Sequence, residues 1–319
     1  MMSHSDHALA VGGEDDPAPA MKRLLVYLES RTAIATLAST CDAAVRRGWA
    51  LQFTADLSPK GDNVRQGDLA RWDEVARWGG PAKAAHATLG LAGDLRATFA
   101  LPQWWDNVLK VAPPWQTVGY MSKAHQRAHV ETWPCDRKRI EAQPVVGWAY
   151  RDHLPLLLNW GPRPRVVLFT MKLRVPERWR NSWRGRLWYF EHVCEAEQIA
   201  EEYGADLTIK SRKKNGDPWW FALIWAHRVW DECVYPLTSL SLLQGATCAM
   251  HFNSGAGLEA RIMRVPQIIN WPVPQEHLDN LPGGPLIYRH MYTDPLEDVI
   301  TYDDARCGER MMDVIEERA

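Results

Sequence analysis

The distribution of apolar residues along the chain predicts an alternation of strands and helices. The apolar run "KRLLVYLES" is followed by "TAIATLASTCDAAVRRG", whose apolar residues have helical spacing, and then by the apolar run "WALQFTAD". A helix between two buried strands is typical of a βαβ unit. The runs "LRATFALPQ", "WQTVGYMS" and "QPVVGWAY" predict further strands of the same mostly parallel sheet, and "GDLARWDEVARWGG" predicts a helix.

A second alternation begins after the segment Asn159 to Arg165, "NWGPRPR", where the prolines and the glycine indicate a domain boundary. We expect strands at Val166 to Thr170 and in "ADLTIK", "CAMHF" and "VPQIIN", and helices near 183–203, 225–234 and 237–245 and in "GLEARIMR". The predicted fold class is α/β, with two Rossmann-like doubly wound domains that face a cleft. We expect residues 1–20 to be a disordered leader, 21–160 the N-terminal domain and 161–319 the C-terminal domain.

Composition agrees with this organisation and narrows the function. A chain of 319 residues with 46% hydrophobic content can fill two cores of ordinary size, and a net charge of −2 argues against coating nucleic acid by bulk charge. The 6 cysteines are scattered without a C-x-x-C pair, so we expect reduced thiols, a cytoplasmic location and no metal site. No apolar run reaches about 18 residues, so we expect no membrane span.

Candidate chemistry lies in the turn after the strand "CAMHF". In an open α/β sheet, ligands bind at the carboxyl ends of strands, where helix N-termini offer free N–H groups. Gly255 and Gly257 allow close backbone approach, Ser254 offers a hydroxyl, and we expect Glu259 in the first helical turn. Such a turn suits a diphosphate or a sugar. A capped helix, with Glu259 placed favourably against the helix dipole, is the alternative interpretation.

Cations follow two other predicted strands of the same half. Lys210 and Arg212 come directly after "LTI", and Thr170 and Lys172 end the run "VVLFTMK". Lysine and arginine donate charge-assisted hydrogen bonds to phosphate oxygens. Taken alone, each run can be a solvated turn, but three such strand ends together predict a phosphate-binding crevice.

The segment from about Pro164 to Pro272 resembles the nucleotide-sugar-binding domain of GT-B glycosyltransferases, particularly the capsule-polysaccharide and CDP-glycerol transferase-like branches. The similarity lies in "LTIKSRKK", at the place of the family's basic phosphate loop, and in "TSLSLLQGATCAMHFNSGAGLEARIMRVPQIIN". The second stretch has the family's order of helix, strand, serine-glycine turn, acidic helix start and strand. The chain departs from the pattern at Lys210, Ser211 and Arg212, where many relatives have a histidine-proline pair.

The resemblance implies a metal-independent glycosyltransferase that takes a nucleotide-sugar as co-substrate and needs no cofactor. Ser254 and Gly255 would then contact the diphosphate, and Glu259 the ribose or sugar hydroxyls. The full expected donor site consists of Thr170, Lys172, Lys210, Arg212, His251, Asn253, Ser254, Gly255 and Glu259. Its cations would neutralise the leaving nucleotide.

The N-terminal half is expected to bind the acceptor and to supply a catalytic base. Asp56, Glu29 and His125 each follow a predicted strand, and Asp56 is preferred because a carboxylate there can reach an acceptor hydroxyl without a partner. An ordinary solvated loop residue is the alternative for each.

The acceptor is open between a glycan, a lipid-linked sugar, a small molecule and DNA. The stretch "RPRVVLFTMKLRVPERWRNSWRGRLW" interleaves arginines with tryptophans, a pattern typical of nucleic-acid binding, which would use Arg180 and Arg184. DNA-modifying glucosyltransferases of bacteriophages also resemble GT-B enzymes. A solvated helix entrance is the simpler interpretation of the stretch. A nucleotide-sugar epimerase and a non-catalytic nucleic-acid-binding protein are the alternative functions.

Overall fold

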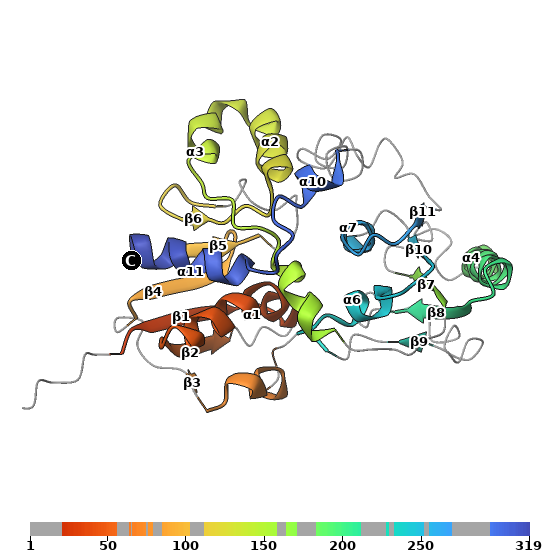
Figure 1. Cartoon of the computed structure of the whole chain (residues 1–319), viewed down its shortest axis with the longest axis horizontal. Helices are drawn as coiled ribbons and strands as arrows, with labels where there is room; N and C mark the ends of the chain where they lie inside the picture. Colours follow the sequence, from red (N-terminus) through yellow and green to blue (C-terminus); the bar gives the residue numbers. More distant parts are fainter. Residues whose placement is uncertain are drawn as a thin grey trace, which may run out of the picture.

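The chain forms two parallel β-sheets that share no strand, each flanked by helices (Figure 1). The computed structural model describes residues 21–55, 64, 66–74, 76–78, 85–102, 112–157, 164–170, 183–211, 228–229, 233–251, 255–269 and 294–319. The expected α/β class with two parallel sheets is therefore confirmed. The expected leader, 1–20, and most of the segment expected to divide the domains lie outside the described residues.

The first sheet has the strand order of a Rossmann domain. Its strands are β1 (Arg23–Leu28), β2 (Ala50–Ala55), β3 (Ala76–Trp78), β4 (Ala87–Leu91), β5 (Phe99–Leu101) and β6 (Thr117–Val118). They pair in parallel in the order β3-β2-β1-β4-β5-β6. The strand order reverses between β1 and β4, which makes the carboxyl ends of these two strands a topological switch point.

Helices α1 (Arg31–Arg46) and α11 (Cys307–Arg318) pack together against this first sheet (Figure 1). Ile34 and Leu37 of α1 share a core with Val26 of β1 and Met311 of α11. The last helix of the chain therefore packs on the N-terminal domain, although it follows the second sheet in sequence. Gly308 allows this contact, because a Cβ added there would lie 2.3 Å from the backbone of Ser39.

The second sheet is covered by helices on both faces. Its strands are β7 (Arg165–Phe169), β8 (Asp206–Lys210), β9 (Arg228–Val229), β10 (Cys248–His251) and β11 (Gln267–Ile269), all parallel, in the order β11-β10-β7-β8-β9. Helix α4 (Trp183–Glu202) packs on one face, and α6 (Thr238–Leu243) and α7 (Gly255–Ile262) pack on the other. The strand order reverses between β7 and β10, which gives this domain its own switch point.

Three sequence-based expectations were wrong. The helix expected in "GDLARWDEVARWGG" is the 3-10 helix η1 (Gln66–Trp72) followed by β3, because Leu69 and Trp72 are buried in the first core while the next residues pair with β2. The strand expected in "QPVVGWAY" is replaced by one isolated bridge, from Tyr120 to Val145, and Gly147 takes a left-handed φ of 98°. Within 225–234, where a helix was expected, residues Arg228–Val229 form strand β9.

Short elements connect the sheets and continue the chain. They are α2 (Lys123–Thr132), η3 (Pro134–Asp136), α3 (Arg137–Glu141), η4 (Ala149–Leu156) and α10 (Leu296–Val299). Helices α6 and α7 lie between the second sheet and the N-terminal domain (Figure 1). Leu240 and Leu258 of these helices share a core with Ala35, Met121 and Trp148. The α6/α7 face of the second sheet is thus turned toward the N-terminal domain.

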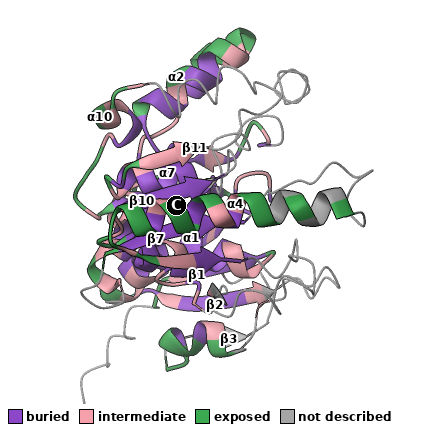
Figure 2. Cartoon of the chain, turned by 90° about the vertical axis from the view of Figure 1, so that its right-hand side faces the viewer, coloured by how far each residue is buried: buried purple, intermediate pink, exposed green. Residues whose placement is uncertain are grey.

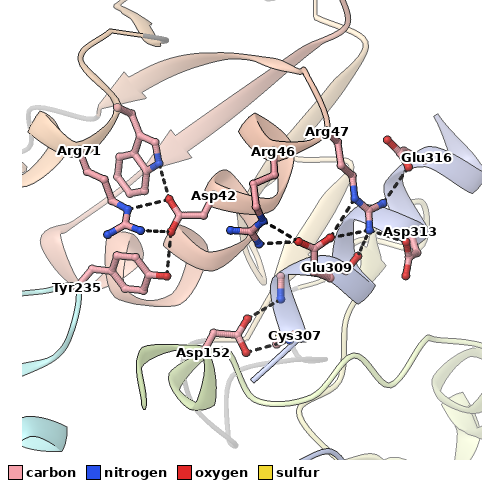
Figure 3. Close-up of polar contacts among 12 residues, drawn as sticks. Asp42, Arg46, Arg47, Arg71, Asp152, Tyr235, Cys307, Glu309, Asp313 and Glu316 are labelled. Atoms are coloured by element: carbon pink, nitrogen blue, oxygen red, sulfur yellow. Dashed lines mark hydrogen bonds and ion pairs between the residues drawn. The ribbon is translucent and has the colours of Figure 1, made fainter. Parts of the chain in front are cut away.

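Polar contacts fix the two domains to each other. The ring of His153, in η4, lies 2.8 Å from the Ala35 carbonyl oxygen through Nε2, and its Nδ1 accepts the Leu237 backbone N–H at 3.0 Å. Nδ1 therefore carries the lone pair and Nε2 the proton, so the imidazole is neutral. The Tyr235 hydroxyl also donates to the Asp42 carboxylate, at 3.1 Å, and this carboxylate is paired with Arg71 (Figure 3).

Candidate functional site

Polar side chains gather at the carboxyl edge of the second sheet, beside its switch point. Lys210 is the last residue of β8 and pairs with Phe169 of β7. Met250 of β10 pairs with Leu168, so His251 is level with Phe169 on the other side of β7. Paired residues of parallel strands face the same side of a sheet. Since Phe169 belongs to the core beneath α6 and α7, Lys210 and His251 lie on that face.

Thr170 and Lys210 are bound to each other at the strand ends. The Thr170 backbone N–H donates to the Lys210 carbonyl oxygen at 3.1 Å, and the Thr170 hydroxyl donates to the same oxygen at 3.2 Å. The Lys210 ammonium donates to the Ser211 carbonyl oxygen at 3.1 Å, and the residue is only 6% exposed. Desolvating an ammonium is costly, and the hydrogen bond to the Ser211 carbonyl oxygen offsets part of that cost. This bond holds the cation at the carboxyl edge of the sheet.

His251 is a neutral, fully buried imidazole at the same edge. Its Nε2 lies 2.9 Å from the Oε1 atom of Gln267 on β11. An amide oxygen can only accept, so Nε2 carries the proton and Nδ1 the lone pair. Burial lowers the pKa of His251, and the hydrogen bond to Gln267 opposes this only in part. His251 is thus built to accept a hydrogen bond at Nδ1 and not to add positive charge. Sequence analysis missed Gln267, which sets this state from a neighbouring strand.

Helix α7 begins at the same sheet edge, but it starts at an earlier residue than expected. It starts at Gly255, so Glu259 lies in its second turn and not in its first. The reason is packing: Ala256 and Ala260 both contact the sheet, which draws the two glycines into the helix. Glu259 is 6% exposed. The N-terminus of α7, with the positive end of its helix dipole, therefore lies at the edge where β10 ends.

Several expected site residues are not described by the structure. Asp56, Lys172, Arg180, Arg212, Asn253 and Ser254 lie outside the described residues. Arg184 lies in the first turn of α4, where the backbone alone is described. The residues that the structure brings together from the expected donor site are therefore Thr170, Lys210 and His251, with the start of α7 beside them.

The expected bases of the N-terminal domain have different surroundings. Glu29 is exposed and directly follows β1, at the first switch point. His125 was expected to follow a strand end, but it lies in the first turn of α2 and is fully buried. Its Nδ1 accepts the Met121 N–H at 3.4 Å, and its ring centroid lies 4.5 Å from that of His129. Its backbone N–H donates to the Ser122 hydroxyl oxygen at 3.0 Å, and Ser122 is the residue that caps α2.

The first switch point also holds a charged pair that sequence analysis missed. The Asp94 carboxylate, in the turn that follows β4, accepts two hydrogen bonds from the Arg96 guanidinium, each 2.9 Å long. The same guanidinium lies over the Tyr27 ring at 4.6 Å. Arg96 is thereby held half-exposed near the ends of β1 and β4. An aspartate and an arginine two residues apart in a loop give no periodic signal, so the sequence offered little to find them.

Three further properties can be stated for the described residues. No group of three or more His, Cys, Asp or Glu side chains is placed there to hold a metal ion. No helix in the described ranges combines the length and the apolar character needed to cross a bilayer. The six cysteines are all free thiols, and Cys41, Cys248 and Cys307 are buried.

The fold and the site together define a protein of two α/β domains, each with polar residues at a switch point. No protein-family model matches the chain, and no curated protein matches it in sequence. Among solved structures, it is similar to a putative UDP-N-acetylglucosamine 2-epimerase from Listeria monocytogenes, with a TM-score of 0.49 and 13% identity over 93% of this chain and 96% of that one.

Two other similar structures are described with activities that differ from each other, one as an epimerase and one as a polymerase. The UDP-GlcNAc 2-epimerase of Methanocaldococcus jannaschii, in complex with UDP-GlcNAc and UDP, has a TM-score of 0.46 and 12% identity over 92% of this chain and 99% of that one. The wall teichoic acid polymerase TagF has a TM-score of 0.45 and 11% identity over 93% of this chain and 88% of that one. With TM-scores below 0.5, none of these similarities decides the activity of this chain.

Proposed function

We propose that the protein is a glycosyltransferase of the GT-B type that binds a nucleotide-sugar at the carboxyl edge of its second sheet. The observation that carries the proposal is that Lys210, Thr170 and His251 lie at the ends of the neighbouring strands β8, β7 and β10, at the edge where α7 begins. A cation and the positive end of a helix dipole both favour a bound diphosphate. The resemblance of the segment around "LTIKSRKK" to nucleotide-sugar-binding domains supports the same ligand.

In the proposed sugar transfer, negative charge develops on the nucleotide that leaves. An acceptor hydroxyl oxygen forms a bond to the anomeric carbon of the donor, and the bond from that carbon to the diphosphate oxygen breaks. The leaving nucleotide gains negative charge, which Lys210 and the positive end of the α7 dipole stabilise, together with the expected contributions of Lys172 and Arg212. The proton of the hydroxyl passes to a base of the N-terminal domain. Glu29, exposed at the first switch point, and Asp56 are the candidates.

The donor site is tested by thermal shift with UDP, GDP, CDP and their sugars. A ligand at about 100 times its Kd should stabilise the folded protein by about 2.7 kcal/mol, which raises Tm by a measurable amount. Lys210→Met, which removes the charge and keeps most of the volume, should abolish the shift. Lys138→Met, at an exposed position in α3, is the matched control and should keep it. If no nucleotide or nucleotide-sugar raises Tm, the proposal fails.

Product analysis separates the glycosyltransferase from its alternative. We expect free nucleoside diphosphate and a glycosylated product when the bound donor is incubated with acceptors of several kinds: glycans, lipid-linked sugars, small molecules and DNA. EDTA should not reduce the yield if the cations of the chain suffice. An epimerised nucleotide-sugar, formed without any acceptor, would instead identify an epimerase.

A further inference from the structure

Helices α6 and α7 are buried on more than one side. Residues 256–262 of α7 are all buried except Arg261 (Figure 2), and residues 238–243 of α6 are all buried except Ser239. A helix on the surface of a domain keeps a polar face toward water, whereas a helix that is buried all round lies inside a core. The second sheet covers one side of α6 and α7, and the N-terminal domain covers another.

The side toward the N-terminal domain is an apolar core that both domains share. Its buried members include Ala35, Ala124 and Trp148 of the N-terminal domain and Leu240, Leu258 and Ile262 of α6 and α7. Even Trp148 and Leu258 are only 5% exposed. Two domains of one chain ordinarily move relative to each other, unless their interface is large and hydrophobic. The shared core gives this interface a hydrophobic interior.

A short segment of the second domain also enters the core of the first. Strand β9 and helix α6 belong to the second domain, but Val234, between them, is buried in the core beneath α1 and α11. The next residue, Tyr235, donates to the Asp42 carboxylate of α1 at 3.1 Å (Figure 3). Moving the domains apart would therefore withdraw Val234 from the first core and break this hydrogen bond.

His153 adds a buried polar link inside the same interface. Its ring is 0% exposed and joins the Ala35 carbonyl oxygen of α1 to the Leu237 backbone N–H. Separation of the domains would leave these groups without their partners, and a buried polar group without a partner is costly. Separation would also expose the side chains of the shared core to water. Both costs oppose a rotation of one domain against the other.

We propose that the shared core locks the two domains into one rigid body, so that ligands bind without domain closure. The carboxyl edge of the second sheet and the switch point of the first then keep the same separation with and without a ligand. For the proposed sugar transfer, folding and not ligand binding would align donor and acceptor. This consequence rests on the proposed function, whereas the rigidity does not.

Hydrogen exchange at increasing urea concentration tests the rigidity without any ligand. In wild type, β1 of the first sheet and β7 of the second should lose protection at the same urea concentration, because one rigid body opens as one unit. Leu240→Ala/His153→Gln weakens the shared core and should separate the two midpoints. If this variant does not fold, Leu240→Val/His153→Gln makes a smaller deletion at the same place.

Leu242→Ala/His86→Gln is the matched control. Leu242 lies in the same helix but belongs to the core of the second sheet, and His86 is exposed. This variant should lower the midpoints of β7 and β1 by the same amount, because the shared core is intact. The proposal is overturned if the control lowers only the midpoint of β7, if the wild-type midpoints differ, or if the Leu240/His153 variant keeps them equal.

X-ray scattering in solution tests the absence of closure. The radius of gyration should not change when a nucleotide that raises Tm is added to saturation. A smaller radius with bound nucleotide would show domain closure and overturn the proposal. If no nucleotide raises Tm, the proposed function fails, and the exchange experiment still decides whether the domains are locked.

Discussion

At the scale of single residues, His153 joins the two domains through one neutral imidazole. Burial lowers its pKa to about 4, although the hydrogen bond to Ala35 acts in the opposite direction. The unfolded chain binds a proton at this side chain below about pH 6.5, while the folded chain binds it only below about pH 4. Stability from this group is thus complete above about pH 6.5 and falls as the pH is lowered toward 4.

We therefore expect the free energy of unfolding to decrease between pH 6.5 and pH 4, with His153 contributing on the order of 3 kcal/mol. His153→Gln should be less stable than wild type at pH 7 and less dependent on pH below it. Urea denaturation at several pH values measures this difference. His86→Gln, at an exposed histidine, is the control and should keep the wild-type slope. Equal slopes in wild type and His153→Gln would exclude the assignment.

Gly308 is the second residue on which the domain arrangement depends. Its backbone N–H donates to the Asp152 carboxylate at 2.7 Å, and the Cys307 N–H donates to the same carboxylate at 3.0 Å (Figure 3). Asp152 thus caps α11 from a distant part of the chain.

Gly308→Ala should lower the free energy of unfolding by about 1–3 kcal/mol or more, because the added methyl group would overlap the backbone of Ser39. Chemical denaturation measures the loss. Gly67→Ala is the control, since a Cβ there meets nothing within 4 Å, and it should change stability little. A wild-type midpoint for Gly308→Ala would mean that α1 and α11 are less closely packed.

At the scale of elements, α11 is held on α1 by a network of charges. The Arg47 guanidinium contacts Glu309, Asp313 and Glu316 at 2.8, 2.7 and 2.9 Å, and Arg46 also contacts Glu309 (Figure 3). Exposed pairs are worth about 0.2–1 kcal/mol each, but one arginine shared by three carboxylates loses its side-chain entropy only once.

Arg47→Met should therefore destabilise the protein by about 1–2 kcal/mol at low salt and by less at high salt. Hydrogen exchange should accelerate in α11 before it does in β1, because the network joins the helix and not the strand. Arg318→Met, at the exposed end of α11, is the control and should leave exchange in the helix unchanged. Uniform acceleration throughout the chain would contradict a local role for the network.

At the scale of the whole molecule, the segment 294–306 connects the domains a second time. Arg127 of α2 contacts Asp298 at 2.6 Å and Asp294 at 3.6 Å, and Arg261 of α7 donates to the Asp294 carbonyl oxygen. Arg151 of η4 pairs with Asp303. Arginines from both domains thus bind one acidic segment, which ties α2 to α7.

Arg127→Glu should repel Asp294 and Asp298 and release α10 from α2, with a loss of about 1 kcal/mol or less, since the contact is exposed. Hydrogen exchange in residues 294–301 should rise while the strands of both sheets keep their protection. Lys138→Glu makes the same charge change on α3 and should leave this segment unaffected. Unchanged exchange in Arg127→Glu would mean that other contacts hold the segment.

The sequence by itself determined the elements whose side chains have one clear period. The apolar runs at β1, β2, β7, β8 and β10 are typical of buried parallel strands, and the helical spacing placed α1, α4 and α6. Because strand ends follow from the same pattern, Thr170, Lys210 and His251 could be expected at one sheet edge from the order of residues alone. Periodicity predicts these elements because the polarity of each residue depends on whether its side chain is buried in the core.

The tertiary structure alone decided which of these elements meet. Strand order, the position of α11 on α1 and the pairing of β3 depend on contacts between segments far apart in sequence, which local periodicity does not encode. The same holds within the site: the phase of α7 follows from Ala256 and Ala260 packing on the sheet, and the proton on His251 is set by Gln267. His153 gave no signal because its two partners, Ala35 and Leu237, become its neighbours only when the domains dock.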